Sequence, residues 1–143
     1  MNNFTVVVPW IIKPKGRPKV NTHTRRAYTP TETRDEEAKV ATAARGSMSF
    51  FNASMSPYPQ PVGVSLTLVV AKPRGAKGKN LPAHPVGYFK GDVDNIFKLV
   101  QDALNGVAYT DDRQVIQSFS NVIWGDESST IIDVYTPEEE ISQ

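Results

Sequence analysis

Carboxylates are crowded into one short part of the sequence. Five aspartates and a single lysine lie within residues 91–112: Asp92, Asp94, Asp102, Asp111, Asp112 and Lys98. Asp92 and Asp94 are two residues apart in a segment expected to be extended, so their side chains would leave one face about 7 Å apart at the backbone. Two carboxylates this close repel each other unless a cation lies between them. Hard oxygen ligands suit Mg²⁺ or Mn²⁺ and match neither zinc nor copper well.

A metal ion held by carboxylates supports the hydrolysis of phosphodiesters. Such an ester is anionic and repels hydroxide, and a bound metal ion both activates water and balances the charge. A helix and a returning loop would place Asp111 or Asp112 beside the first pair, so that three carboxylates surround one cation. Lys98 lies one helical turn from both Asp94 and Asp102, where an ion-pair ladder is available. Near the metal it could instead hold a phosphate or stabilise charge on a leaving oxygen.

Each aspartate also has an ordinary structural explanation. Asp94 is a good N-cap for a helix, and Asp102 on a helix surface is more often solvated than catalytic. Asp111 and Asp112 suit a turn. Caps and turns do not explain why this segment holds five acids and one lysine while the basic residues lie elsewhere.

The formal net charge of +1 conceals a strong division along the chain. Residues 1–90 carry 14 Lys and Arg against 4 Asp and Glu, whereas residues 91–143 carry 2 against 11. Residues 11–30 and 72–90 contain no acidic residue. This division indicates a polyanion held near a cluster of carboxylates, with solvated surface as the alternative. The candidate phosphate contacts are Lys13, Lys15, Arg17, Lys19, Arg25, Arg26, Lys72, Arg74, Lys77 and Lys79.

The composition excludes several classes of protein. The chain has no cysteine, so it is neither a zinc finger of the thiolate type nor a thiol enzyme. His23 and His84 lack metal-ligand spacing and are expected at the surface. The aspartates do not fit an EF-hand loop, and there is no P-loop or dinucleotide-binding glycine motif. No apolar run suits a membrane helix and the N-terminus lacks a secretion signal, so we expect an intracellular protein.

The elements that must position these residues follow from hydrophobic periodicity and turn residues. We expect strands at residues 4–8 and 62–70, and a hairpin of two strands at residues 115–124 and 130–135. One helix would begin with a cap at Thr31 or Thr33 and run to about Phe50 or Phe51. A second would be capped by Asp94 or Asn95 and end at Asn105-Gly106.

Long loops complete the expected arrangement. Residues 13–30 and about 72–89 are rich in Gly, Pro and Lys and show no periodicity, so both are expected to be loops. The order β-α-β-α-β-β predicts an α/β fold: one small domain over residues 1–143, with a mixed sheet and two main helices. The acidic tail from about residue 137 to 143 is expected to be flexible.

Four gapped motifs stand at fixed spacings in this chain: Asp92-x-Asp94-Asn95-x-x-Lys98-x-x-x-Asp102-x-Leu104-Asn105, Asp111-Asp112-x-Gln114-Val115, Pro14-x-Gly16-Arg17-Pro18 and Tyr28-Thr29-Pro30-x-x-Thr33. They resemble the motifs of the RusA family of Holliday-junction resolvases of bacteria and their phages. The resemblance covers most of the chain in the right order. Residues 74–89 are richer in Gly and Pro than expected for that family.

The resemblance implies a RusA-like fold and a homodimeric, Mg²⁺-dependent endonuclease that cuts symmetric strands of a four-way DNA junction in recombination and repair. It implies that Asp92, Asp94 and Asp112 are the essential metal-binding carboxylates, that Lys98 is needed for cleavage, and that Asp111 supports them. The expected location is the cytoplasm of a bacterial or phage-infected cell. Two alternatives stay open: a branched-DNA-binding protein without catalysis, and a nuclease for flaps or other branched DNA.

Overall fold

A four-stranded mixed sheet organises the chain. The computed structural model describes residues 3–17, 19–28, 30–75 and 79–138. The strands are β1 (Phe4–Val8), β4 (Val62–Ala71), β5 (Val115–Gly125) and β6 (Ser129–Tyr135), in the spatial order β1-β6-β4-β5. β4 pairs in parallel with β5 and antiparallel with β6, which pairs antiparallel with β1. This confirms the predicted α/β fold with a mixed sheet and two main helices.

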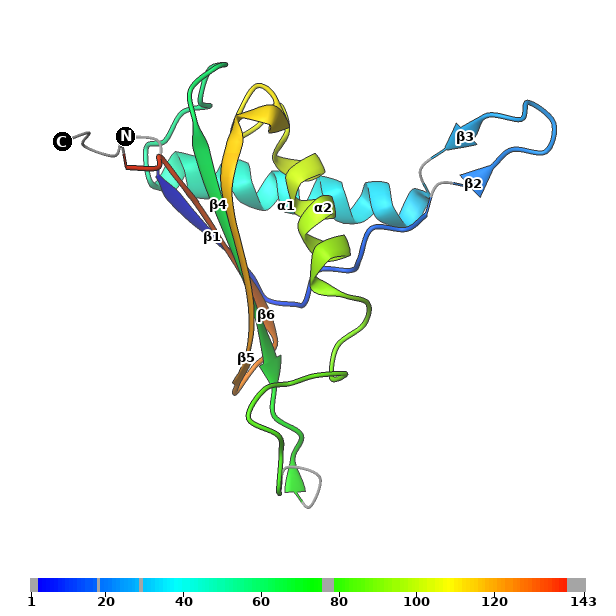
Figure 1. Cartoon of the computed structure of the whole chain (residues 1–143), viewed down its shortest axis with the longest axis vertical. Helices are drawn as coiled ribbons and strands as arrows, with labels where there is room; N and C mark the ends of the chain where they lie inside the picture. The colour runs from blue at the N-terminus through cyan, green and yellow to red at the C-terminus, as the bar shows by residue number, and fades with distance from the viewer. Residues whose placement is uncertain (1–2, 18, 29, 76–78, 139–143) are drawn as a thin grey trace.

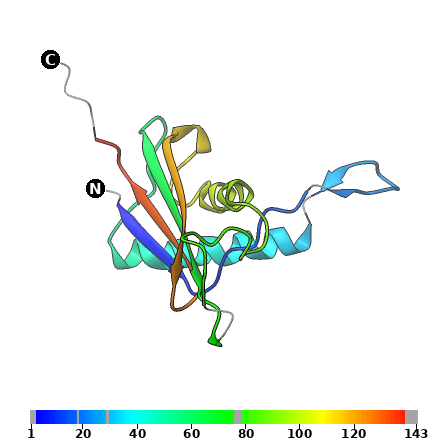
Figure 2. The ribbon, with the colours of Figure 1, turned by 60° about the horizontal axis from the view of Figure 1, so that its bottom comes forward.

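The core lies on one face of the sheet, beneath helices α1 (Thr31–Phe50) and α2 (Val93–Leu104) (Figures 1 and 2). Strand residues alternate between the two faces. Val64, Leu66 and Leu68 of β4 are fully buried toward the helices, whereas Ser65 and Thr67 between them are only partly buried on the other face. The sequence therefore forms a two-layer structure in which the helices cover one side of the sheet.

The predicted hairpin between residues 115–124 and 130–135 is wrong. Both strands form, but β4 lies between them and each pairs with β4 instead of with the other. The strand–helix–strand passage from β4 through α2 brings β5 back parallel to β4, as parallel strands require a long crossover. After the turn at residues 126–128 the chain crosses to the opposite side of β4 and fills the place between β4 and β1.

A short hairpin projects from the segment that was expected to be only a loop. It consists of β2 (Lys19–Val20) and β3 (Ala27–Tyr28), which extend away from the sheet and helices (Figure 1). The Asn21 side chain accepts hydrogen bonds from the backbone N–H groups of His23 and Thr24 at 2.8 and 3.1 Å. This local turn gives the basic residues at the tip a defined conformation. Of the motif residues named above, Pro18 and Thr29 lie outside the described residues.

The start of α1 differs from the prediction. The residue in the N-cap position is Pro30, and no side chain caps the helix, so neither Thr31 nor Thr33 is the cap. The Thr33 hydroxyl instead accepts a hydrogen bond from the Gly16 backbone N–H at 3.0 Å. A Cβ on Gly16 would lie 2.9 Å from that oxygen, so the close approach requires glycine. Thr33 therefore attaches the basic segment to α1.

Glu36 of α1 holds the same segment at a second point. Its side chain is 2% exposed, and Oε2 accepts hydrogen bonds from Trp10 Nε1 at 3.1 Å and from the Lys13 backbone N–H at 2.7 Å. A buried carboxylate needs such donors, because its desolvation is otherwise costly. The chain between β1 and the hairpin is thus fixed across the first turns of α1.

No helix within the described ranges is long and apolar enough to cross a membrane. His23 and His84 are exposed, as predicted. Of the acidic tail, Glu139 and Glu140 lie outside the part of the chain that the structure describes.

Candidate functional site

The first two candidate carboxylates lie at the start of α2. Its apolar stripe is buried against the core: Ile96, Leu99, Val100, Ala103 and Leu104. The N-cap is Asp92, whose Oδ1 accepts a hydrogen bond from the Asn95 backbone N–H at 2.9 Å. The prediction that Asp94 or Asn95 caps the helix is therefore wrong. The end of the helix is as predicted, with Asn105 at the C-cap and Gly106 at a positive φ of 79°.

Asp94 and Lys98 are exposed on the outward side of α2, one turn apart. The predicted ladder through Lys98 to Asp102 does not form among the described residues. Asp102 instead pairs with Lys15, with 2.6 Å between Nζ and Oδ2. The hydrogen bond to Asp102 raises the pKa of Lys15, so its ammonium form persists to a higher pH in the folded chain than in the unfolded chain. Asp94 and Lys98 thus keep their charged groups in solvent.

Two substitutions of Asp92 separate its structural role from its charge. Asp92→Ala removes the cap and is expected to cost about 1 kcal/mol in the free energy of unfolding, whereas Asp92→Asn retains a capping side chain and costs far less. Urea unfolding of both variants and the wild type measures the difference. Equal stability of the two variants would contradict the capping role.

The second pair of carboxylates belongs to a short 3₁₀-helix, η2 (Asp112–Gln114). Asp111 caps it, since its Oδ1 accepts from the Arg113 backbone N–H at 2.8 Å. The Arg113 guanidinium also donates to both carboxylate oxygens at 3.2 Å. These hydrogen bonds lower the pKa of Asp111. Asp111 therefore has partners within its own loop, whereas the Asp112 side chain is exposed in the first turn of η2.

Buried polar side chains hold η2 in place. The Gln114 amide nitrogen donates to the carbonyl oxygens of Ser56, Pro57 and Gln60 at 3.0–3.1 Å, and its oxygen accepts from the Asp111 backbone N–H at 2.9 Å. The three carbonyl contacts tie η2 to the connection between α1 and β4, and the contact with Asp111 closes the cap of η2 itself. The buried hydrogen bonds of Gln114 therefore fix the position of Asp112, although paired aspartates are often found in flexible turns.

The turn before η2 closes on the end of α2. The Gly106 N–H donates to the Tyr109 carbonyl at 2.8 Å, and the buried Tyr109 hydroxyl donates to the Gln101 carbonyl at 2.8 Å. Burial, with the nearby charges of Asp112 and Asp102, raises the pKa of the Tyr109 hydroxyl. The tyrosine therefore stays protonated and remains a donor to the helix backbone.

The helix itself separates the carboxylates. Asp92 and Asp94 lie at its first turn, whereas Asp112 follows the turn that packs on its last residues (Figure 1). Twelve helical residues span about 18 Å. Within the described part of the chain, no three His, Asp or Glu side chains lie close enough together to hold a metal ion. Asp94 lies within the helix, so the expectation that Asp92 and Asp94 leave one face of an extended segment is wrong. Asp92 and Asp94 belong to one end of α2 and Asp112 to the other, and the assignment of all three as ligands stays a prediction.

The first basic segment lies directly against the acidic end of α2. A Cβ on Gly91, which has a φ of 82°, would lie 2.7 Å from the Pro14 ring. The Lys15 backbone N–H donates to the Asn95 carbonyl at 3.3 Å. The sequence gives no signal for this contact except the glycine. It places the first basic segment against the start of α2, where Asp92 and Asp94 lie.

The other predicted phosphate contacts lie on the surface. Lys13, Arg17, Lys19, Lys72, Arg74 and Lys79 are exposed, as are Arg25 and Arg26 on the projecting hairpin. Lys77 lies outside the described residues. The second basic segment leaves the far end of β4 and returns to α2 through the loop at residues 79–91 (Figure 1).

Aromatic contacts hold that loop against β5. Trp124 Nε1 donates to the Pro82 carbonyl at 2.8 Å, and the Tyr88 and Trp124 rings meet edge to face with centroids 4.9 Å apart. The loop therefore has a fixed attachment close to its return to Gly91.

Two comparisons relate the sequence of this chain to known proteins. A search of the curated proteins finds no match. Residues 9–135 of the 143 match the protein family described as endodeoxyribonuclease RusA. The matched range includes both basic segments, α2 and η2, and so contains every candidate residue of the site. The chain therefore belongs to the RusA family of endodeoxyribonucleases.

Proposed function

We propose that this protein resolves four-way (Holliday) DNA junctions by paired, symmetric cleavage that depends on Mg²⁺ or Mn²⁺. The observation that carries the proposal is the family match over nearly the whole chain, together with an exposed Asp92–Asp94 pair lying beside a basic segment. Cutting a phosphodiester needs charge neutralisation at the scissile bond and cations along the strand, and both are available here. The setting is recombination and repair in a bacterial or phage-infected cell.

The donor chemistry of the site fits a hard divalent cation. The three candidate ligands are carboxylates, the chain has no cysteine thiolate, and Asp94 and Asp112 are exposed to solvent. Asp92 Oδ1 accepts the hydrogen bond that caps the helix, and Oδ2 accepts a longer one from the Asn95 side-chain nitrogen at 3.4 Å, so the carboxylate is oriented by both. Asp92, Asp94 and Asp112 would hold the ion, supported by Asp111. When bound, the ion supplies activation of water and charge balance at the phosphate.

The remaining residues bind and orient the strand. Lys98 projects from the same exposed side of α2 as Asp94, where its ammonium group stabilises negative charge on a phosphate or leaving oxygen. The basic segments give affinity that falls with salt and carries little sequence information.

Homodimerisation would meet two requirements of the proposed activity. Symmetric cutting needs two sites related by a two-fold axis. The length of α2 keeps Asp112 of a chain away from that chain's own Asp92 and Asp94. If the α2 helices of two copies lie side by side and antiparallel, Asp112 of one chain comes close to Asp92 and Asp94 of the other.

A cleavage assay tests the activity. Purified protein with a synthetic four-way junction and Mg²⁺ or Mn²⁺ is expected to give paired symmetric nicks, and flap and duplex substrates are expected to be cut far more slowly. Absence of cutting with any divalent ion would leave a branched-DNA-binding protein as the function. Faster cutting of flaps would make the protein a flap nuclease.

Mixing two inactive variants tests the shared site. If each site draws ligands from both chains, dimers formed from Asp94→Asn and Asp112→Asn chains contain one site without either substitution. Such mixtures are then expected to nick one strand of the junction, although neither variant alone cuts. No recovery of nicking on mixing, with heterodimers demonstrated by differently tagged chains, would place each site within one chain.

A further inference from the structure

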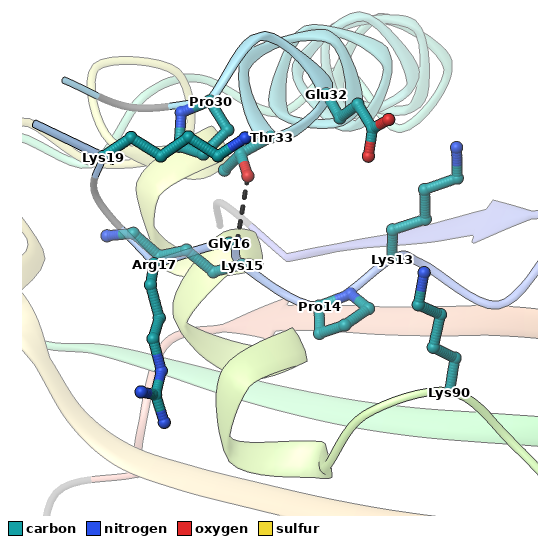
Figure 3. Close-up of a pocket in the computed structure, with 10 residues that line it drawn as sticks. All are labelled: Lys13, Pro14, Lys15, Gly16, Arg17, Lys19, Pro30, Glu32, Thr33 and Lys90. Carbon is teal, nitrogen blue, oxygen red and sulfur yellow. Dashed lines mark hydrogen bonds between the residues drawn. The ribbon is translucent and has the colours of Figure 1, made fainter. Parts of the chain in front are cut away.

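The two basic segments, residues 11–30 and 72–90, are separated by 41 residues in the sequence and meet at one cavity. The cavity has a volume of about 390 Å³ and lies between the start of α1 and the segment that precedes the β2–β3 hairpin (Figure 3). Its charged lining residues are Lys13, Lys15, Arg17, Lys19, Lys90 and Glu32. Lys90 comes from the second basic segment and had not been singled out among the candidate phosphate contacts.

The positive charge of this cavity is only partly compensated. Of its five cationic side chains, Lys15 is paired with Asp102. Among the described residues the other four form no ion pair, and Glu32 is the one acidic side chain in the lining. In Figure 3 the ammonium ends of Lys13 and Lys90 rise on the side of the cavity where the Glu32 carboxylate lies. Concentrated positive charge in a concave site favours an anion with several oxygens, such as a phosphate group.

The cavity adjoins the candidate cleavage site. Lys90 is two residues before Asp92, and the intervening Gly91 packs against Pro14, another residue of the lining. The chain on the other side of the cavity is fixed by hydrogen bonds from Gly16 to Thr33 and from Lys13 to Glu36. The backbone that carries Lys13 and Lys90 is therefore held close to the start of α2, and a group that aligns a strand for cutting requires such a fixed attachment.

We propose that this cavity holds one backbone phosphate of the DNA strand to be cut, within a few nucleotides of the scissile phosphate. The proposal rests on the proposed function, because it takes DNA as the substrate. Lys13 and Lys90 bind the phosphate oxygens, and Lys15 is kept in place by Asp102. These residues position the strand and take no part in bond cleavage.

Neutral phosphates placed one at a time along the strand test this assignment. A methylphosphonate removes the charge of a single phosphate, and binding of each modified junction is measured without divalent metal so that strands stay intact. With the full-length wild-type chain, one position near the cleavage site is expected to weaken binding by about 5- to 10-fold. The Lys13→Gln/Lys90→Gln variant is expected to lose that penalty at the same position and to keep the penalties elsewhere, as interacting groups do in a double-mutant cycle.

A matched double variant controls for loss of charge alone. Lys39→Gln/Arg45→Gln removes two exposed cations from α1 away from the cavity and is expected to leave the wild-type penalties unchanged. Thermal unfolding confirms that both double variants are folded. Identical methylphosphonate profiles for wild type and Lys13→Gln/Lys90→Gln would overturn the assignment. If the wild-type protein binds junctions but never cuts them, the proposed function is wrong. The assignment of the cavity is then tested by the binding measurements alone.

Substitution of Glu32, the acidic residue of the lining, is expected to have the opposite effect on junction binding. Glu32→Gln removes a negative charge beside the phosphate, so junction binding is expected to tighten and its dependence on salt to become steeper. The effect should vanish on the junction whose methylphosphonate lies at the position identified above. Weaker binding, or tightening that persists on that modified junction, would show that no phosphate lies next to Glu32.

Discussion

Junction cleavage by the Asp94→Asn variant is expected to fall at least about 100-fold below wild type. Removing a residue that only hydrogen-bonds to a metal ligand already lowers activity by up to about that much, and Asp94 is assigned as a ligand itself. Binding to the junction is expected to be retained or slightly stronger, since one negative charge near the phosphates is removed. Single-turnover cleavage in Mg²⁺ and binding without metal measure the two effects separately.

The structure sharpens this prediction. Because Asp92 and not Asp94 caps α2, Asp94→Asn leaves the helix cap intact. The variant is therefore expected to unfold at the wild-type temperature, so a loss of cleavage cannot be ascribed to an unravelled helix. Asp35→Asn, a substitution of an exposed aspartate on α1, is the matched control and should cut normally. Cleavage by Asp94→Asn within a few-fold of wild type would remove Asp94 from the metal site.

The two main helices and the four strands of the main sheet could be predicted from sequence because each follows from local signals, whereas the β2–β3 hairpin was missed. The apolar spacing of α2 and the glycine after Asn105 define that helix, and the alternation of residues 62–70 defines β4. The pairing of the last two strands could not be predicted in this way. Whether β6 lies beside β5 or on the far side of β4 depends on how the α2 crossover packs, and a short turn between two strands favours a hairpin on local grounds alone.

The candidate site shows the same limit. Residue types and spacing identified the aspartates, but not which one caps the helix, since Asp92 and Asp94 are equally good capping residues. The distance between Asp112 and the aspartate pair depends on the turn at Gly106, which closes on the helix and does not run back along it. The contact of Gly91 with Pro14 joins segments far apart in sequence, so the cavity lined by Lys13 and Lys90 emerges only in three dimensions.

Gln114→Glu is expected to cause the largest loss of stability among these substitutions. The amide nitrogen of Gln114, a residue 2% exposed, donates to three backbone carbonyls, and a carboxylate of nearly the same shape can only accept. Three carbonyl oxygens would then face a buried negative charge. We expect a loss of about 3–5 kcal/mol in the free energy of unfolding at pH 7, which lowers the melting temperature by roughly 10 °C for a chain of this size.

The pH dependence of this variant identifies the cause. Burial and the facing carbonyls disfavour the charged form, so the pKa of the introduced carboxyl is higher in the folded than in the unfolded state. The folded state then binds more protons, and the stability of the variant relative to wild type must rise as the pH falls toward the ordinary carboxyl range near about 4.3. Urea unfolding between pH 7 and 5 measures this difference.

Gln117→Glu makes the same chemical change at an exposed position, where the side-chain oxygen accepts a hydrogen bond from the Tyr135 hydroxyl. This control variant should show neither the loss of stability nor its pH dependence. If the free energies of unfolding of Gln114→Glu and wild type differ by the same amount across this pH range, the charge is not the cause. Lost packing, and not a buried charge among carbonyls, would then destabilise η2, which carries Asp112.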